Sequence, residues 1–191
     1  MNQVAEQNLP RDQIFTAPAW ADLRGRLSPR WRKLLLTVHV ALSVGLVGAD
    51  LSVILLGITA LVTGNPELVR AGYLTMDILA SNMMLPLAVG ALVSGVVIAL
   101  STPWGLARYY WVLVKLVLTI LALTALVLVL RPRLEQAAAL VLNAPPADLA
   151  AGMGPLGVIS FVGPIGALSV LLINMALAYY KPWGQVKRLR S

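Results

Sequence analysis

Four polar side chains lie inside four different apolar stretches of this sequence, where ionisable and polar groups are otherwise rare. They are His39, Lys115, Ser94 and Asn174, and each lies five or six residues from one end of its stretch. At a rise of ~1.5 Å per residue, with neighbouring helices antiparallel, all four share one depth, roughly 8–10 Å from one face of a bundle. Charged groups at such depths cost free energy and mark substrate or proton paths. The sequence therefore predicts a buried polar site.

Asp50 is a second candidate, because a carboxyl in an apolar helix is costly. It follows His39 by 11 residues, which on a helix is a net rotation of ~20° and a rise of ~16 Å. Both side chains then face the same partner helix at different depths. We predict catalytic or transport roles for Asp50 and Lys115. The alternatives are that Lys115 snorkels to the headgroups, and that Ser94 and Asn174 only join helices.

The elements that carry these residues are predicted to be membrane-spanning helices. Of the 191 residues, 59% are hydrophobic and 12% are charged, and the mean hydropathy is +0.81. We predict an all-α integral membrane four-helix bundle, with spans at about 34–62, 76–100, 109–130 and 156–180. The remaining segments are a tail over 1–30, a loop over about 131–155 with a membrane-surface stretch, and a basic tail over 185–191. The helical domain thus covers 31–184.

The distribution of basic residues predicts the orientation of the bundle. Three segments on one side carry eleven Lys and Arg residues: Arg11, Arg24, Arg26, Arg30, Arg32, Lys33, Arg108, Lys181, Lys187, Arg188 and Arg190. The other side carries Arg70, Arg131 and Arg133. By the positive-inside rule, both termini are cytoplasmic and the protein lies in the cell membrane. Because the basic residues flank the spans instead of alternating with aromatics along a face, we expect lipid and not nucleic acid as the partner.

Two similar segments suggest an internal 2+2 helix repeat. Pro86 precedes Pro103-Trp104-Gly105 by 17 positions, and Pro164 precedes Pro182-Trp183-Gly184 by 18. Two helix pairs that both start inside would be parallel repeats about an axis along the membrane normal. The alternative is that Pro-Trp-Gly is a common interfacial helix stop.

Composition also excludes several kinds of chemistry. The chain has no cysteine and one histidine, so a disulfide framework, a thiolate metal site and a site of several imidazoles in one chain are excluded. No nucleotide-binding glycine motif or zinc-protease pattern is present.

Three runs of sequence resemble known membrane proteins. They are LLLTVHVALSVGLVGAD over 34–50, STPWGLARYYWVLVKLVLT over 101–119 and KPWG over 181–184. Together they resemble an uncharacterised family of small bacterial membrane proteins of actinobacterial type. More distantly, the early histidine and the run WVLVKLVL resemble the CopD copper-resistance membrane domain and HemJ-type protoporphyrinogen oxidase. That resemblance implies a haem-ligand role for His39 and a functional role for Lys115. HemJ-like proteins carry further histidines in their spans, whereas this chain has none besides His39.

Three functions follow as hypotheses. The first is a redox protein that binds haem b, with His39 as ligand to the haem iron and Lys115, Ser94 and Asn174 in the cofactor site. The second is a proton-coupled small transporter or permease subunit with a path through Asp50, His39 and Lys115. The third is a structural or assembly subunit of a membrane complex. With only four spans, we expect a homo-oligomer or a partner in a membrane complex.

Overall fold

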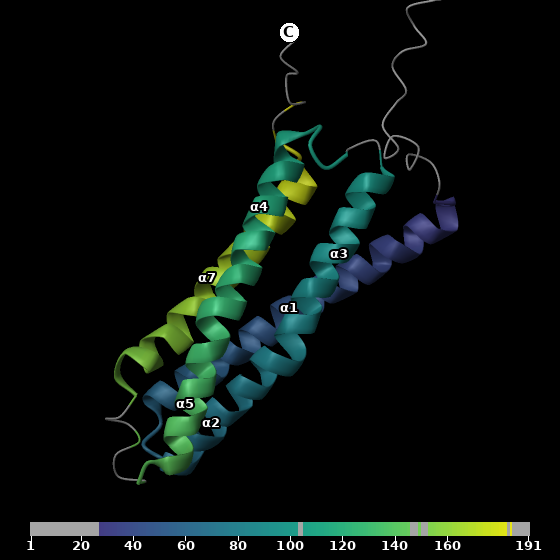
Figure 1. The fold of residues 1–191 in the computed structure, drawn as a ribbon. Helices are drawn as coiled ribbons and strands as arrows, with labels where there is room; N and C mark the ends of the chain where they lie inside the picture. Colours follow the sequence, from purple (N-terminus) through teal and green to yellow (C-terminus); the bar gives the residue numbers. More distant parts are fainter. Residues whose placement is uncertain (1–26, 103–104, 146–148, 150–152, 183, 185–191) are drawn as a thin grey trace, which may run out of the picture.

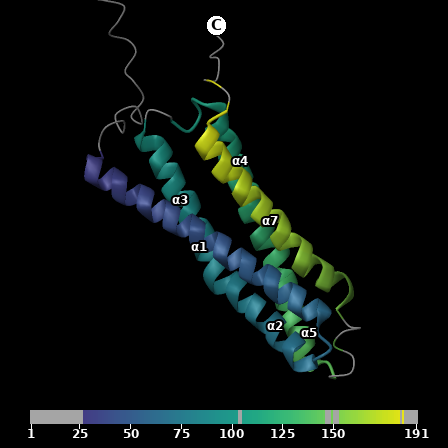
Figure 2. The ribbon, with the colours of Figure 1, turned by 180° about the vertical axis from the view of Figure 1, so that it is seen from behind.

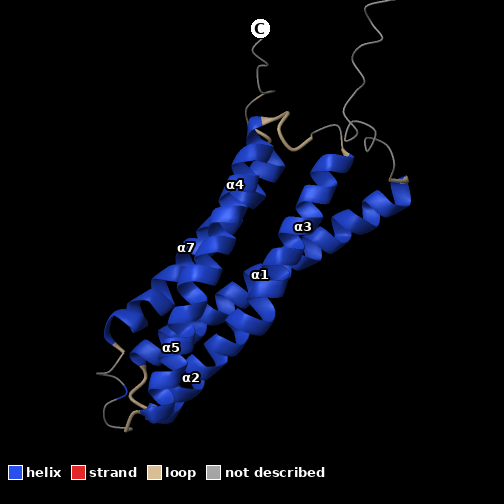
Figure 3. Ribbon diagram, in the orientation of Figure 1, coloured by secondary structure: helices blue, strands red, loops and turns tan. Residues whose placement is uncertain are grey.

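The structure is a computed structural model that describes residues 27–102, 105–145, 149, 153–182 and 184. All regular structure in these residues is helical, without a strand (Figure 3). Four helices of the described chain are long and apolar enough to cross a membrane: Pro29–Val62, Pro66–Ser101, Tyr110–Asn143 and Ser160–Tyr180. The predicted all-α class is confirmed, as is the presence of four helices long and apolar enough to span a membrane. The tail at 185–191 and most of that at 1–30 lie outside the described residues.

The first two helices are joined by a tight connection. Helix α1 (Pro29–Val62) ends where Thr63 takes an extended conformation. The Asn65 side chain then accepts a hydrogen bond of 2.9 Å from the Glu67 amide, and Pro66 fills the first position of α2 (Pro66–Leu79). A capping Asn followed by Pro is a strong helix start. The second helix therefore begins at Pro66, and the prediction that it begins near Met76 was wrong.

Two prolines lie within long helices that do not end at them. The second helix continues through a π-helical turn, η3 (Ala80–Met84), into α3 (Leu85–Ser101). The third runs through α4 (Tyr110–Ala125), a second π-helical turn, η4 (Leu126–Leu130), and α5 (Arg131–Asn143). Pro86 and Pro132 each follow the end of a π turn by two residues. A proline ring collides with the carbonyl four residues before it, and a wider turn relieves that collision.

The prediction of a loop over 131–155 was wrong for its first half, because helix α5 occupies Arg131–Asn143. Arg131 begins a helix that extends to Asn143, and Leu134, Ala137 and Val141 are buried in the bundle core. The sequence suggested a stop because Pro132 lies between two arginines. A proline in the first turn of a new α segment is tolerated, since that N–H would have no intrahelical partner. The last helix, α7 (Gly154–Tyr180), contains the buried Pro164 and is close to the predicted span.

Both ends of the helical domain lie at the same end of the bundle. The start of α1, the end of α3, the start of α4 and the end of α7 are all at one end, and α2 and α5 form the opposite end (Figures 1 and 2). The core cluster fills the α2/α5 half with side chains such as Val53, Met76 and Leu134. Toward the other end, α1 stays beside α3 and α4 beside α7, and the two pairs diverge (Figures 1 and 2).

Arg70 on α2 donates hydrogen bonds to backbone carbonyls at the end of α5. The Arg70 Nε donates to the Val141 carbonyl over 2.9 Å, and Nη2 donates to the Ala144 carbonyl over 3.3 Å. The last carbonyls of a helix have no intrahelical donor, so a cation at this place satisfies them and also favours the helix dipole. This contact joins α2 to α5 at the end opposite the two termini.

Candidate functional site

His39 and Ser94 form a direct contact between α1 and α3. The His39 Nδ1 lies 2.9 Å from the Ser94 Oγ. The Ser94 hydroxyl carries one hydrogen, and its oxygen lies 2.7 Å from the Gly90 carbonyl, to which it donates. With that hydrogen on the Gly90 carbonyl, the Ser94 oxygen accepts a hydrogen bond from an Nδ1–H of the imidazole, and the Ala91 carbonyl also acts on the ring as a backbone acceptor. This assigns the tautomer and leaves the lone pair on Nε2, the atom by which histidine commonly binds a metal.

A glycine allows the imidazole to lie against α3. A Cβ added at Gly95 would come within 3.1 Å of the His39 Cε1, closer than carbon atoms normally approach. Ser94 is 5% exposed, and His39 is partly buried. The ring is thus held on one edge by a hydrogen bond and on one side by the close approach of α3.

A second polar contact joins the other helix pair. The Asn174 Nδ2 on α7 donates to the Thr119 Oγ1 on α4 over 3.2 Å, and Thr119 donates to the Lys115 carbonyl over 2.8 Å. The Asn174 Oδ1 is buried without a hydrogen-bond partner among the residues described. Thr119 was not among the predicted site residues, although its position one turn after Lys115 was a signal that could have found it.

Lys115 is near both contacts, and its backbone carbonyl accepts the hydrogen bond from Thr119. Its side chain is partly buried on α4, and its ammonium lies near enough to the His39 imidazole for the two groups to interact electrostatically. Of the four residues predicted at one depth, His39 and Ser94 are bonded to each other, Asn174 is bonded to Thr119, and Lys115 contributes its backbone carbonyl to Thr119. Their functional roles stay predictions.

Asp50 lies in a separate place. Its side chain is 0% exposed, and neither carboxyl oxygen has a hydrogen-bond partner in the described chain. A Cβ on Gly45 of α1 would lie 3.5 Å from the Leu87 side chain, and one on Gly57 would lie against Ser160 and Phe161 of α7 and 4.0 Å from the Met76 sulfur. Asp50 lies between these two positions, so the antiparallel register places it opposite the π turn η3, which α1 contacts. It does not join the His39 pair, since 11 residues along a helix are ~16 Å.

In the part of the chain that the structure describes, no three His, Cys, Asp or Glu side chains are grouped so that they could hold a metal ion. Comparisons with protein-family models, curated proteins and solved structures found no match. The four candidate spans indicate the class, which is a helical multi-pass membrane protein.

Proposed function

We propose that this chain is a haem-binding protein of the cell membrane, with His39 as the axial ligand of haem b. The hydrogen bond of 2.9 Å from His39 to Ser94 carries this proposal. A histidine that binds a metal almost always donates its other N–H to an oxygen of the protein, which fixes the ring and its tautomer. The His39–Ser94 contact is such an arrangement, with Nε2 as the remaining ligand atom.

The surrounding groups fit the chemistry of a haem. A macrocycle supplies four nitrogen ligands, so one imidazole is sufficient where a bare metal ion would need a cluster. Lys115, with a positive charge near the imidazole, suits a propionate. When bound, the haem would supply one-electron redox chemistry. Because His39 is the single histidine of the chain, any second protein group that holds the haem iron would be Lys115, a methionine or the His39 of a second copy.

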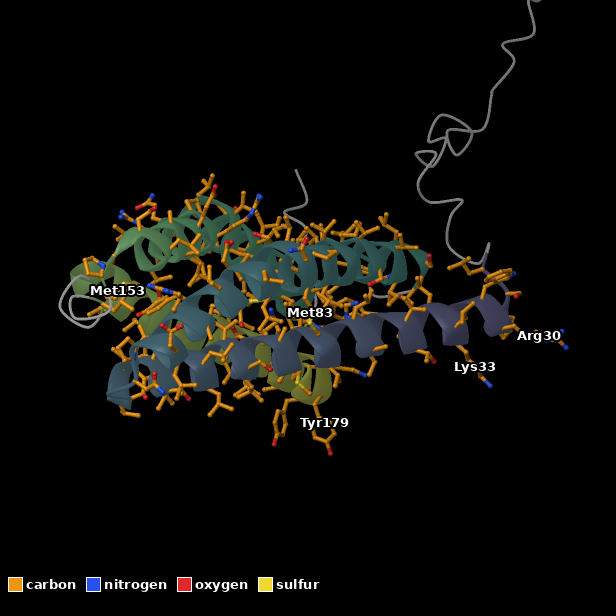
Figure 4. The ribbon with its side chains drawn as sticks, turned by 90° about the horizontal axis from the view of Figure 1, so that it is seen from below. Arg30, Lys33, Met83, Met153 and Tyr179 are labelled. Carbon is orange, nitrogen blue, oxygen red and sulfur yellow. The ribbon has the colours of Figure 1, made fainter. Side chains whose placement is uncertain are left out.

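The proposed orientation places the His39 end of the bundle on the cytoplasmic side. Among the described residues, that end carries five basic side chains and no acidic one: Arg30, Arg32, Lys33, Arg108 and Lys181. Arg30 and Lys33 point away from α1 (Figure 4). Tyr179, which is 81% exposed, and Trp31, 62% exposed, lie at the same end, as in the aromatic belt of a membrane interface.

The orientation is testable because the chain has no cysteine. Single cysteines are introduced at two exposed positions, Gly64→Cys between α1 and α2 and Ala107→Cys before α4. A membrane-impermeant maleimide should label the Gly64 variant in intact cells, and the Ala107 variant only after lysis. The opposite pattern would show that the bundle is inverted.

Equal spacings in the two helix pairs support the proposed 2+2 repeat. The His39–Ser94 and Thr119–Asn174 contacts each join residues 55 positions apart. Thr119 follows His39 by 80 positions, and Asn174 follows Ser94 by the same 80. Parallel repeats about an axis along the membrane normal would place such contacts in equivalent positions. On this proposal, one repeat supplies the haem ligand and the other supplies neutral polar groups at the same depth.

Absorption spectroscopy of the detergent-purified chain tests haem binding. Spectra are recorded with added haem, oxidised and after dithionite reduction, for the wild type, His39→Ala and Ser43→Ala. Ser43 is the matched control, because its hydroxyl donates to the His39 carbonyl over 2.8 Å and forms no bond with the ring. A Soret band with reducible α and β peaks should persist in Ser43→Ala and be lost in His39→Ala. A wild-type protein that binds no haem would refute the proposal.

Proton-coupled transport is the second candidate, and the buried, unpaired carboxyl of Asp50 is the observation that favours it. Carboxyls at such positions serve proton relays in pumps and transporters. Its test is proton flux into liposomes that contain the purified chain, compared with the Asp50→Asn variant. Equal flux in the two would exclude Asp50 from a transport path.

A further inference from the structure

Asp50 is buried in a way that an ionised carboxylate does not tolerate. Its side chain is 0% exposed, and both oxygens lack a hydrogen-bond partner in the described residues. Removing a carboxylate from water without a partner costs much more free energy than removing the neutral acid. The cost falls on the charged form, so the surroundings favour a carboxyl group that holds its proton.

The charged groups on neighbouring elements do not compensate Asp50. Arg131 on α5 contacts the π turn η3, where its Nε donates to the Ser81 hydroxyl over 3.1 Å. Asp77 on α2 lies five to six residues from the level that faces Asp50, toward the α2/α5 end of the bundle. His39 lies 11 residues before Asp50 on α1, toward the end that carries the two termini. Neither α3 nor α7 contains an Asp, Glu, Lys, Arg or His. Among the described residues, Asp50 therefore has neither a cation nor a donor to hold its charge.

The helix opposite Asp50 is also irregular. The register of α1 against the second helix places Asp50 opposite η3, between the Leu87 and Met76 levels. Pro86 has no N–H, so the backbone hydrogen-bond ladder lacks one donor just after this turn. Short π-helical turns inside α-helices are frequent at functional sites. Burial, the missing partner and the π turn thus coincide at one level of the bundle.

We propose that Asp50 is a proton-binding site, a carboxylic acid that stays protonated at neutral pH inside the membrane domain, with one proton per chain. Such a group reacts with a hydrophobic carbodiimide, dicyclohexylcarbodiimide, which partitions into the bilayer. The acid oxygen bonds to the central carbon of the reagent, and the acid proton moves to one of its nitrogens. The O-acylisourea that forms then rearranges to a stable N-acylurea by transfer of the acyl group from oxygen to nitrogen. The ionised form does not add in this way.

The experiment uses the full chain in liposomes at pH 7, treated with dicyclohexylcarbodiimide and analysed by intact mass and peptide mapping. We expect one reagent per chain, on the peptide that contains Asp50. An ordinary aspartate with a pKa near 3.9 is protonated in about one molecule in 1,000 at this pH, so Asp50 should react up to about 1,000-fold faster. Asp77→Asn is the matched control and should leave the labelling unchanged, whereas Asp50→Asn should abolish it.

Two results would overturn the proposal. One is a wild-type chain without label on the Asp50 peptide at pH 7, which needs no variant and so does not depend on variant folding. The other is equal labelling by a water-soluble carbodiimide, which would show that Asp50 is open to water. The readout requires no haem and should be unchanged in His39→Ala, so its failure and the failure of haem binding are distinguishable.

Discussion

The tautomer of His39 is the most direct test of the geometry at the candidate site. The structure gives Nδ1–H as the donor to Ser94, because the Ser94 hydroxyl is already committed to the Gly90 carbonyl over 2.7 Å. The perturbation is Ser94→Ala, which removes the acceptor and keeps a small side chain at a buried position. Ser43→Ala is the control, since its hydroxyl contacts the backbone of His39 and not the ring.

The size of the effect follows from one hydrogen bond. An intramolecular hydrogen bond contributes about 1–1.5 kcal/mol net, and 1.4 kcal/mol is a factor of ten in an equilibrium. Loss of the Ser94 oxygen should therefore lower the ratio of the Nδ1–H to the Nε2–H tautomer by about fivefold to tenfold. The ratio in Ser43→Ala should stay at the wild-type value.

The assay is nitrogen NMR of protein labelled with ¹⁵N-histidine. Because the chain has one histidine, the spectrum contains one pair of ring nitrogens and no assignment is needed. The chemical shifts separate the neutral ring from the imidazolium, and the two-bond couplings to the ring protons show whether Nδ1 or Nε2 carries the proton. A wild-type spectrum of the Nε2–H tautomer, or of an imidazolium with no lone pair, would refute both the assignment and the ligand role built on it.

Three further predictions concern thermal stability in detergent. Gly95→Ala should destabilise the protein by about 1 kcal/mol through loss of the imidazole–serine bond. Gly90→Ala should not, because its added methyl approaches, at the same 3.1 Å, a leucine methyl that can rotate. Equal melting temperatures of the two variants would contradict this prediction. Arg70→Ala should cost about 2 kcal/mol, because two carbonyls at the end of α5 lose a charged donor, and a neutral result would show that water replaces it. Asn174→Leu should change stability by less than about 1 kcal/mol, because it removes the hydrogen bond to Thr119 together with the buried, unpaired Asn174 oxygen. Thr119→Val should destabilise the protein more, because it leaves the Asn174 amide nitrogen without its acceptor. The reverse order would be evidence against the hydrogen bond of 3.2 Å between them.

Local properties of the sequence were sufficient for the number of helices and the depth of the polar residues. Apolar length alone determines which segments can cross a bilayer, and four such helices are present among the described residues. Depth follows from counting residues along a helix, because the rise per residue is constant. His39 and Ser94, 55 positions apart, are in contact, as counting predicted for their level.

Tertiary structure decided which way the side chains face and where the helices end. Pro132 looked like a stop, but a π turn before it allowed the third helix to continue to Asn143. Each π turn also inserts a residue, which rotates the following helix by roughly 100°, so periodicity across Pro86 could not give the facing of Ser94. The missing partner of Asp50 depends on side chains contributed by other helices. Contacts between helices depend on such rotations and on packing, which no local pattern of residues contains, whereas helix length and depth are sums along a single chain.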